Sequence, residues 1–350
     1  MGFKRMIHAV ETHAGEPMRV ITGGAPHLPG NSVYEQMEYL IKNDDQLRLM
    51  MLREPRGYPP LCCNLLVPPK HPEADAGFII MEQTEYPMMS GGNTISVVTV
   101  MLEMGLLPMK EPVTELTLEA PAGLIRVRAE CSGGKVTQVT FKNVPAFAVH
   151  LDAEIEVPHL GRVTVDVAWG GMFYVIADVR QFPQLKLEPE YGGEIARISS
   201  MIRQAAIEQL PVSHPHYPGI GITNAQLSGP TDNPLADWKN AVTVSSGQLD
   251  WERPATWTGA LDRCPCGTGT CAKMAVLKAK GQLELGRDFR HEGILGNVFT
   301  GRLLEEVEME GITSVVPEIS GRAWIYGISN YLLDHDDPFP NGFTIGDIWA

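Results

Sequence analysis

The strongest constraint on the fold is a pair of similar segments placed half a chain apart. Residues 90–105 read SGGNTISVVTVMLEMG and residues 266–281 read CGTGTCAKMAVLKAKG, so the second begins 176 positions after the first in a chain of 350 residues. Each opens with Ser or Cys followed by Gly, has Thr at its fifth position, and ends in Gly at its sixteenth. Similarity over this length and at this offset makes a duplicated lobe the economical interpretation.

Both segments have the pattern of a helix that follows a tight turn. Tyr86-Pro87 precedes the first and Cys264-Pro265 precedes the second. Each then continues as an apolar-rich run and stops at a glycine, the residue preferred just beyond a helix C-terminus. At roughly 150 residues per domain, the length also favours two lobes. We assign residues 1–150 to the first lobe, with the C-terminal segment as a candidate to return to it, and 151–330 to the second.

Strand signals are strong elsewhere in the chain, which predicts an α+β protein. Residues 124–128 and 136–141 alternate apolar and polar side chains around Ser132-Gly133-Gly134, the pattern of a β-hairpin. Residues 162–167 alternate as well, and Gly170-Gly171 precedes the apolar stretch 172–177. Apolar spacing predicts helices within 36–40 and 195–208. Residues 211–237 show weak periodicity and are predicted to form long loops.

Composition excludes several classes of function. With 42 acidic against 28 basic residues, the net charge of −14 argues against a nucleic-acid binder. No apolar run reaches the roughly 18 residues of a membrane span, and the first residues turn polar too soon for a signal peptide. Six cysteines are too few for a disulfide scaffold. We therefore expect a cytoplasmic protein with reduced thiols.

A glycine-rich loop that opens a helix points backbone N–H groups at one place and adds the positive end of the helix dipole. That combination binds anions such as a carboxylate. If two such loops face each other across a cleft, a small carboxylate lies between Ser90 and Cys266. A helix N-terminus also lowers a thiol pKa, which predicts that Cys266 is partly thiolate and can act as a base. Ser90, a much weaker acid, suits proton relay or donation.

Other interpretations of the cysteines and histidines are weaker. Cys264 and Cys266, or Cys62 and Cys63, lack the spacing and the second ligand pair of a structural zinc site, so we expect no metal. His13 is a candidate catalytic residue, although a structural histidine is the better interpretation.

At these loops the sequence resembles the proline racemase family. Residues 262–270, Asp-Arg-Cys-Pro-Cys-Gly-Thr-Gly-Thr, closely match that family's Asp-Arg-Ser-Pro-Cys-Gly-Thr-Gly-Thr signature, and residues 89–95 resemble its Met-Cys-Gly-His signature. The resemblance implies the fold of diaminopimelate epimerase, with two pseudo-symmetric lobes, each a curved and mostly antiparallel sheet around a central helix, and the active site between them. It also implies cofactor-free proton transfer at the α-carbon of proline-like amino acids.

The family roles carry over to named residues. Ser90 becomes the proton acceptor with Cys266 facing it, and Asp262 becomes the ligand of the ring ammonium. Backbone groups hold the substrate carboxylate, and they belong to Gly91, Gly92, Gly267 and Thr268. No cofactor is implied, and the expected partner is the small-molecule substrate, hydroxyproline, with a homodimer left open.

Three departures bear on the reaction: Ser90 replaces a catalytic cysteine, Gly92 replaces a histidine, and Asn224 replaces a histidine often found upstream of the second loop. Loss of the matched thiol pair favours a one-face reaction, dehydration of trans-3-hydroxy-L-proline to 1-pyrroline-2-carboxylate. The alternative is a 4-hydroxyproline 2-epimerase that uses Ser90 and Cys266 on the two faces. A catalytically inactive amino-acid-binding protein is a third hypothesis, against which the intact Asp262 and Cys266 argue.

Overall fold

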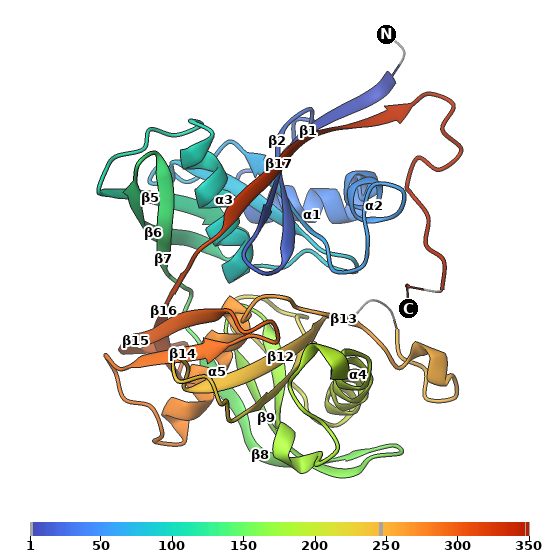
Figure 1. Cartoon of the computed structure of the whole chain (residues 1–350), viewed down its shortest axis with the longest axis vertical. Helices are drawn as coiled ribbons and strands as arrows, with labels where there is room; N and C mark the ends of the chain where they lie inside the picture. Colours follow the sequence, from blue (N-terminus) through green and yellow to red (C-terminus); the bar gives the residue numbers. More distant parts are fainter. Residues whose placement is uncertain (1–2, 245–247, 347, 350) are drawn as a thin grey trace. The chain divides into compact units, whose positions relative to one another are not determined.

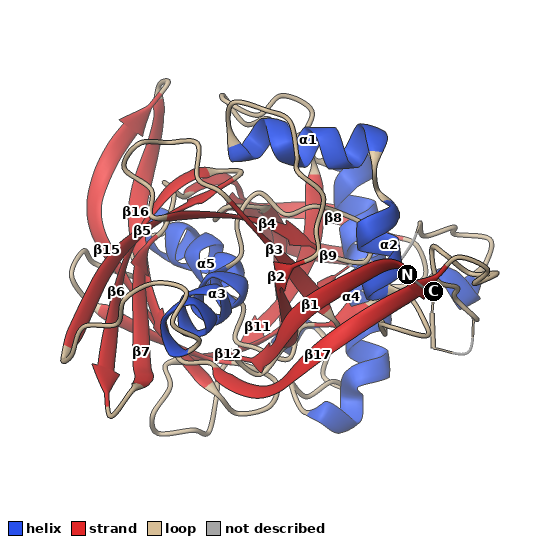
Figure 2. Ribbon diagram, turned by 90° about the horizontal axis from the view of Figure 1, so that it is seen from above, coloured by secondary structure: helices blue, strands red, loops and turns tan. Residues whose placement is uncertain are grey.

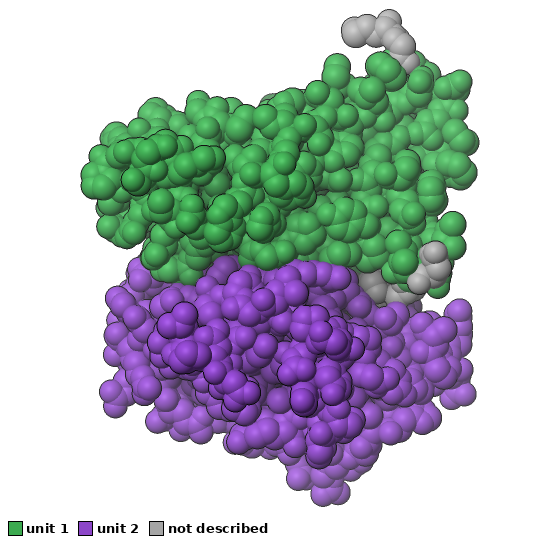
Figure 3. Space-filling view, in the orientation of Figure 1, with its two compact units in different colours: residues 1–141, 320–349 green, residues 142–319, 350 purple. Residues whose placement is uncertain are grey.

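The computed structural model describes residues 3–244, 248–346 and 348–349. The chain forms two compact units, shown in Figure 3. Unit 1 comprises residues up to 141 together with 320–349, and unit 2 comprises residues 142–319.

The sheet of unit 1 begins with a strand from the C-terminal end of the chain. Its order is β17-β1-β2-β3-β4-β5-β6, and the β2–β3 and β4–β5 pairs are parallel while the other four are antiparallel. Strand β7 follows β6 after two residues. The bounds are β1 (Phe3–His13), β2 (Pro17–Gly23), β3 (Cys62–Val67), β4 (Ala76–Met81), β5 (Val113–Ala120), β6 (Gly123–Ser132), β7 (Lys135–Lys142) and β17 (Trp324–Asp334).

The sheet of unit 2 repeats the same sequence of pairings. Its order is β8-β9-β10-β11-β12-β14-β15, again with the third and fifth pairs parallel and the rest antiparallel. This shared pattern confirms the two-lobe α+β fold with mostly antiparallel sheets. The bounds are β8 (Phe147–Val157), β9 (Gly161–Trp169), β10 (Phe173–Asp178), β11 (Ile222–Gly229), β12 (Trp238–Val244), β13 (Ala260–Leu261), β14 (Asp288–Glu292), β15 (Val298–Met309) and β16 (Ile312–Gly321).

The two similar segments form the two central helices. Helix α3 (Gly91–Glu103) follows β4 in unit 1, and α5 (Gly267–Ala279) follows β13 in unit 2. The next strand after each helix, β5 or β14, forms the second parallel pair of its unit, β4–β5 or β12–β14. Residues 91–102 of α3 and 267–277 of α5 are all buried. In Figure 2, α3 lies inside the curve of its sheet, where it contacts β1, β2, β3 and β17. A helix buried on every side is the core of its lobe.

The ends of these helices match in detail. At α3 the N–H of Leu106 donates to the carbonyl of Met101, and at α5 the N–H of Gln282 donates to the carbonyl of Leu277. Gly105 and Gly281 both take φ +69°, the left-handed conformation of a Schellman cap. The duplication thus extends to the hydrogen bonds that end each helix.

The remaining α-helices connect the strands of the first parallel pair in each unit. Helix α1 (Val33–Asn43) and α2 (Gln46–Leu52) lie between β2 and β3, and α4 (Gly192–Gln209) lies between β10 and β11. Ser32 caps α1 by accepting a hydrogen bond from the N–H of Glu35 at 3.1 Å. In Figure 1, α4 packs on one face of the unit 2 sheet, in agreement with its contacts to β11 and β12. In the described ranges, every helix is too short or too polar to cross a bilayer.

The local predictions are mostly confirmed, with one clear error. The hairpin is β6–β7, and Gly133 and Gly134 between its strands both have positive φ, as a type I′ turn requires. The strands predicted around 162–167 and 172–177 and the helices around 36–40 and 195–208 are present. The loop prediction for 211–237 is wrong over β11. That strand lies mid-sheet with a burial pattern that does not alternate, so period-two analysis overlooks it.

Candidate functional site

Cys266 occupies the position just before α5, in a strained backbone conformation. Its φ of 56° and ψ of 102° lie in a region of backbone conformation that residues other than glycine rarely adopt. The residue is 6% exposed, and its carbonyl accepts a hydrogen bond from the N–H of Thr270 at 2.8 Å. Such strain persists only where the surroundings enforce it, and it concentrates at functional sites.

A tyrosine from the neighbouring sheet contacts the thiol directly. The hydroxyl of Tyr174, on β10, lies 3.3 Å from Cys266 Sγ and 2.7 Å from Thr268 Oγ1. The turn before β10 packs on the helix backbone: a Cβ at Gly170 would lie 2.2 Å from the carbonyl oxygen of Thr268. Strand β10 and the first turn of α5 are therefore held together at the thiol.

The acidity of this thiol differs from the prediction. Burial raises the pKa of Cys266 well above its ordinary value, the negative charge of Asp262 raises it further, and the hydrogen bond from Tyr174 lowers it. The expected lowering at the helix N-terminus is wrong for the free protein. The reason is physical: the side chain is removed from water and faces a carboxylate, and both penalise the thiolate.

We predict that Tyr174→Phe makes the thiol less acidic still. Because the Tyr174 hydrogen bond favours the thiolate, its removal should move the pKa of Cys266 upward, so less thiolate is present at any pH below that pKa. The rate of iodoacetamide inactivation, followed against pH, should shift toward higher pH relative to the wild type. An unchanged profile, or a shift toward lower pH, would show that Tyr174 does not tune Cys266.

The loop before Cys266 is fixed by several hydrogen bonds. Asp262 is partly exposed, and its Oδ1 accepts from the N–H of Cys264 at 2.8 Å. The carbonyl of Pro265 accepts from Thr270 Oγ1 at 3.2 Å and from Asn240 Nδ2 at 3.1 Å.

A buried histidine supports the same loop. His291 Nδ1 lies 2.9 Å from Thr270 Oγ1, and burial lowers the pKa of His291 to about 3, so the ring is neutral near pH 7. Since the Thr270 hydroxyl donates to the carbonyl of Pro265, we assign the proton to Nδ1 of His291.

Ser90 occupies the equivalent position before α3, in ordinary extended backbone with φ −146°. Its Oγ accepts a hydrogen bond from Asn93 Nδ2 at 2.9 Å, and Asn93 Oδ1 accepts from Asn64 Nδ2 at 2.6 Å. Among the residues that the structure describes, Asn93 is the only side chain hydrogen-bonded to Ser90 Oγ. Within the described part of unit 1, no carboxylate or imidazole is hydrogen-bonded to Ser90 Oγ, whereas the Asn93 amide donates to it and so favours the deprotonated oxygen.

The structure places the predicted residues in two groups. In unit 1, Gly91 and Gly92 form the first turn of α3 directly after Ser90. In unit 2, Gly267 and Thr268 form the first turn of α5 after Cys266. The first N–H groups of a helix have no intrahelical acceptor, so both turns offer donors to an anion.

Sequence reasoning missed three residues beside these loops. Two of them are Tyr174, beside Cys266, and Asn93, beside Ser90. Gln226, on β11, is 1% exposed, and its amide has no partner among the described residues. A Cβ at Gly269 would lie 2.9 Å from Gln226 Oε1 and 3.0 Å from Cys266 Sγ, so the amide and the thiol meet at this glycine. Asn93 was visible in the first motif, but no local signal pointed to Tyr174 or Gln226.

The cysteines and histidines considered as metal ligands do not form a metal site among the described residues. All six cysteines are free thiols. Within the described residues, no three His, Cys, Asp or Glu side chains come together as a metal site would need. His13 stacks on Trp324, with ring centroids 5.4 Å apart, which agrees with a structural role.

Comparison with known proteins identifies the family. The proline racemase family model matches residues 9–344. A hydroxyproline epimerase from Agrobacterium vitis, solved with trans-4-hydroxy-L-proline bound, is 35% identical, with a TM-score of 0.90, over 100% of this chain and 98% of its own. A probable proline racemase from Agrobacterium radiobacter, solved with carbonate bound, is 36% identical, with a TM-score of 0.89, over 98% of each chain.

A more distant structure shares the fold. The Bacillus anthracis phenazine biosynthesis protein of the PhzF family is 12% identical, with a TM-score of 0.58, over 94% of this chain and 99% of its own. The family match covers both loops, both central helices and the strands that hold them. The chain therefore belongs to the proline racemase family of enzymes.

Proposed function

We propose that this enzyme is a cofactor-independent 4-hydroxyproline 2-epimerase, with Ser90 and Cys266 as its proton-transfer residues. The observation that carries the proposal is the full-length similarity, at 35% identity, to an epimerase that binds trans-4-hydroxy-L-proline. The two helix N-termini, neither of which is capped by a side chain, and the buried thiol support it, since they supply anion-binding donors and an acid–base group.

The chemistry starts with the substrate carboxylate. Backbone N–H groups of Gly91, Gly92, Gly267 and Thr268 are proposed to hold it. They stabilise the charge that moves onto it when the α-proton leaves, as donors in an oxyanion hole do. Asp262 is proposed to bind the ring ammonium.

That ammonium also changes the thiol. The negative charge of Asp262 is one cause of the raised pKa of Cys266, and a cation bound there offsets it. Substrate binding thus favours the thiolate, which takes the α-proton from one face. Ser90 then donates its proton to the other face, and the resulting alkoxide accepts the Asn93 hydrogen bond until it is reprotonated.

Dehydration of trans-3-hydroxy-L-proline is a second candidate, and the environment of Ser90 favours it. Epimerisation in both directions requires Ser90 to act as a base in one of them, yet no base among the described residues is hydrogen-bonded to its hydroxyl. Dehydration needs one face only. In this substrate the 3-hydroxyl and the α-hydrogen share a ring face. The Cα–H bond breaks, its electrons form the ring double bond, and the hydroxide leaves with a proton as water.

Incubation of the purified enzyme in D₂O with each hydroxyproline separates the two reactions. We expect trans-4-hydroxy-L-proline to yield the 2-epimer with deuterium at C2, measured by NMR. If 1-pyrroline-2-carboxylate forms from the 3-hydroxy substrate while the 4-hydroxy substrate gains no deuterium, the enzyme is a dehydratase. Ligand-dependent thermal stabilisation without either product would identify a binding protein instead.

A further inference from the structure

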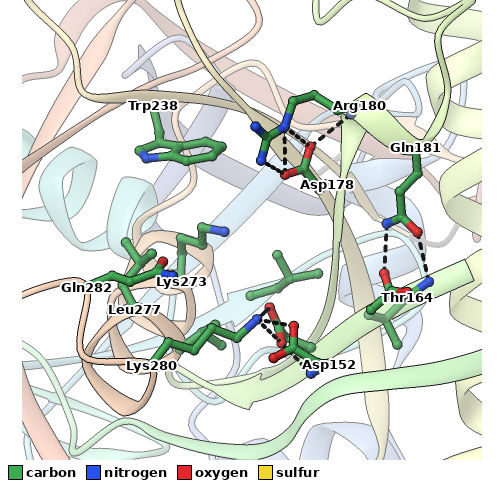
Figure 4. A pocket seen from close by; sticks show the side chains of 14 residues that line it. Asp152, Thr164, Asp178, Arg180, Gln181, Trp238, Lys273, Leu277, Lys280 and Gln282 are labelled. Atoms are coloured by element: carbon green, nitrogen blue, oxygen red, sulfur yellow. Dashed lines mark hydrogen bonds and ion pairs between the residues drawn. The ribbon is translucent and has the colours of Figure 1, made fainter.

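A polar cavity in unit 2 lies along the second half of α5, away from the residues assigned above. Its volume is about 620 Å³, within the range of small-molecule sites. The walls come from β8, β9, β10, β12 and α5, all within unit 2. We call it the α5 cavity (Figure 4).

The face of α5 that lines this cavity breaks the duplicated pattern. Lys273 and Lys280 lie seven residues apart, two helical turns along one face. The matching positions of α3, 176 residues earlier, are Val97 and Met104. Val97 is fully buried in the core of unit 1. The fold therefore accommodates an apolar residue where unit 2 carries a lysine, and positions that break a local rule are candidates for function.

Lys273 is a buried amine without a carboxylate partner. The residue is 9% exposed, and no described residue forms an ion pair or hydrogen bond with its Nζ. The ammonium lies over the Trp238 ring, 5.1 Å from the centroid. Burial lowers the pKa of this amine, while Asp166 and Asp178 raise it. Figure 4 shows the amine among Trp238, the Arg180–Asp178 pair and the Lys280–Asp152 pair. The side chain lines the cavity, where a bound ligand can supply acceptors for the three ammonium protons.

The other charges of the cavity are already paired. Lys280 Nζ lies 2.7 Å from an oxygen of Asp152 and 2.7 Å from an oxygen of Asp166. Arg180 and Asp178 form a second pair at 2.6 Å. With Lys273 included, three positive charges of the lining balance three negative ones. A ligand with a net charge would therefore add a charge that nothing in the lining compensates. A zwitterion carries no net charge, and its carboxylate can accept hydrogen bonds from the unpaired ammonium of Lys273.

We propose that the α5 cavity binds a small zwitterionic amino or imino acid at a second, non-catalytic site. Its carboxylate accepts from Lys273 Nζ, and its ammonium lies against the carboxylate of Asp178 or Asp166. The apolar wall, which includes Val276 and Leu277, contacts the side chain. Lys273 lies seven residues beyond Cys266, about 10 Å along the helix, so the ligand stabilises α5 without touching the thiol.

The test is calorimetric titration of the wild-type enzyme in the presence of saturating pyrrole-2-carboxylate, a flat mimic of the deprotonated substrate that occupies the catalytic loops. Glycine, L-proline and L-leucine are the probes, with acetate and methylammonium as half-ligands. At least one amino acid should bind, and Lys273→Met should weaken that binding tenfold or more while epimerisation or dehydration continues. Methionine suits this site because α3 is apolar at the matching position.

Lys278→Met is the matched control, because Lys278 lies on the same helix but pairs with Glu306 outside the cavity. This variant should bind the amino acids as tightly as the wild type does. Asp178→Asn is a second variant, and because it removes a negative charge from the lining it should weaken the binding of the amino acids relative to that of acetate. The proposal is overturned if no probe binds, if binding survives Lys273→Met, or if acetate binds as tightly as the amino acids.

Discussion

Cys266→Ser is expected to lower kcat by about 10²–10⁴-fold with either hydroxyproline, the usual contribution of a positioned acid–base group. The substitution keeps the shape of the side chain and its contact with Tyr174. An alcohol is far less acidic than a thiol, so the proposed base for the α-proton is lost. Steady-state kinetics and α-deuterium incorporation measure the effect.

Cys271→Ser is the matched control for this variant. Cys271 is also buried on α5, but its Sγ accepts a hydrogen bond from Asn143 Nδ2 at 3.1 Å, whereas the Tyr174 hydroxyl contacts Cys266. Its kcat should stay within a few-fold of the wild type. Near-normal turnover by Cys266→Ser would instead make Ser90 the sole acid–base residue.

Ser90→Ala is expected to lower kcat for epimerisation, again by about 10²–10⁴-fold, because the second ring face loses its proposed proton donor. The Asn93 amide would then face an apolar methyl group in place of its acceptor. Ser96→Ala, on the same helix with its hydroxyl bonded to Met18 Sδ at 3.1 Å, is the control and should keep its activity.

The conservative variant Ser90→Cys gives a sharper outcome. It rebuilds two thiols and should raise the rate of epimerisation relative to dehydration. If Ser90→Ala leaves both reactions unchanged, Ser90 has no part in proton transfer, and the pairing of Ser90 with Cys266 fails.

The duplication was the part of the fold most open to prediction from sequence. A helix that starts after Ser90 or Cys266 and ends at Gly105 or Gly281 is specified locally, by turn residues, apolar content and a C-terminal glycine. Those same local rules located the hairpin around Gly133. Because each central helix is buried over all but its last residues, its sheet must surround it, and the same order of strand pairings results in both units.

Other features depend on contacts between distant residues. The pairing of β17 with β1 joins the two ends of the chain, and nothing in either segment alone specifies the partner. Tyr174 is 92 residues from Cys266, and its role became visible only when β10 was placed against α5. The acidity of Cys266 also depends on burial and on Asp262, which outweigh the local effect of the helix N-terminus.

The central claim is that one small imino acid is acted on by both loops, and a crystal structure with pyrrole-2-carboxylate tests it most directly. We expect the ligand carboxylate to accept hydrogen bonds from the first N–H groups of α3 and α5, with Ser90 Oγ on one face of the ring and Cys266 Sγ on the other. A ligand that contacts one loop alone, or a ring with neither atom beside its α-carbon, would contradict the account.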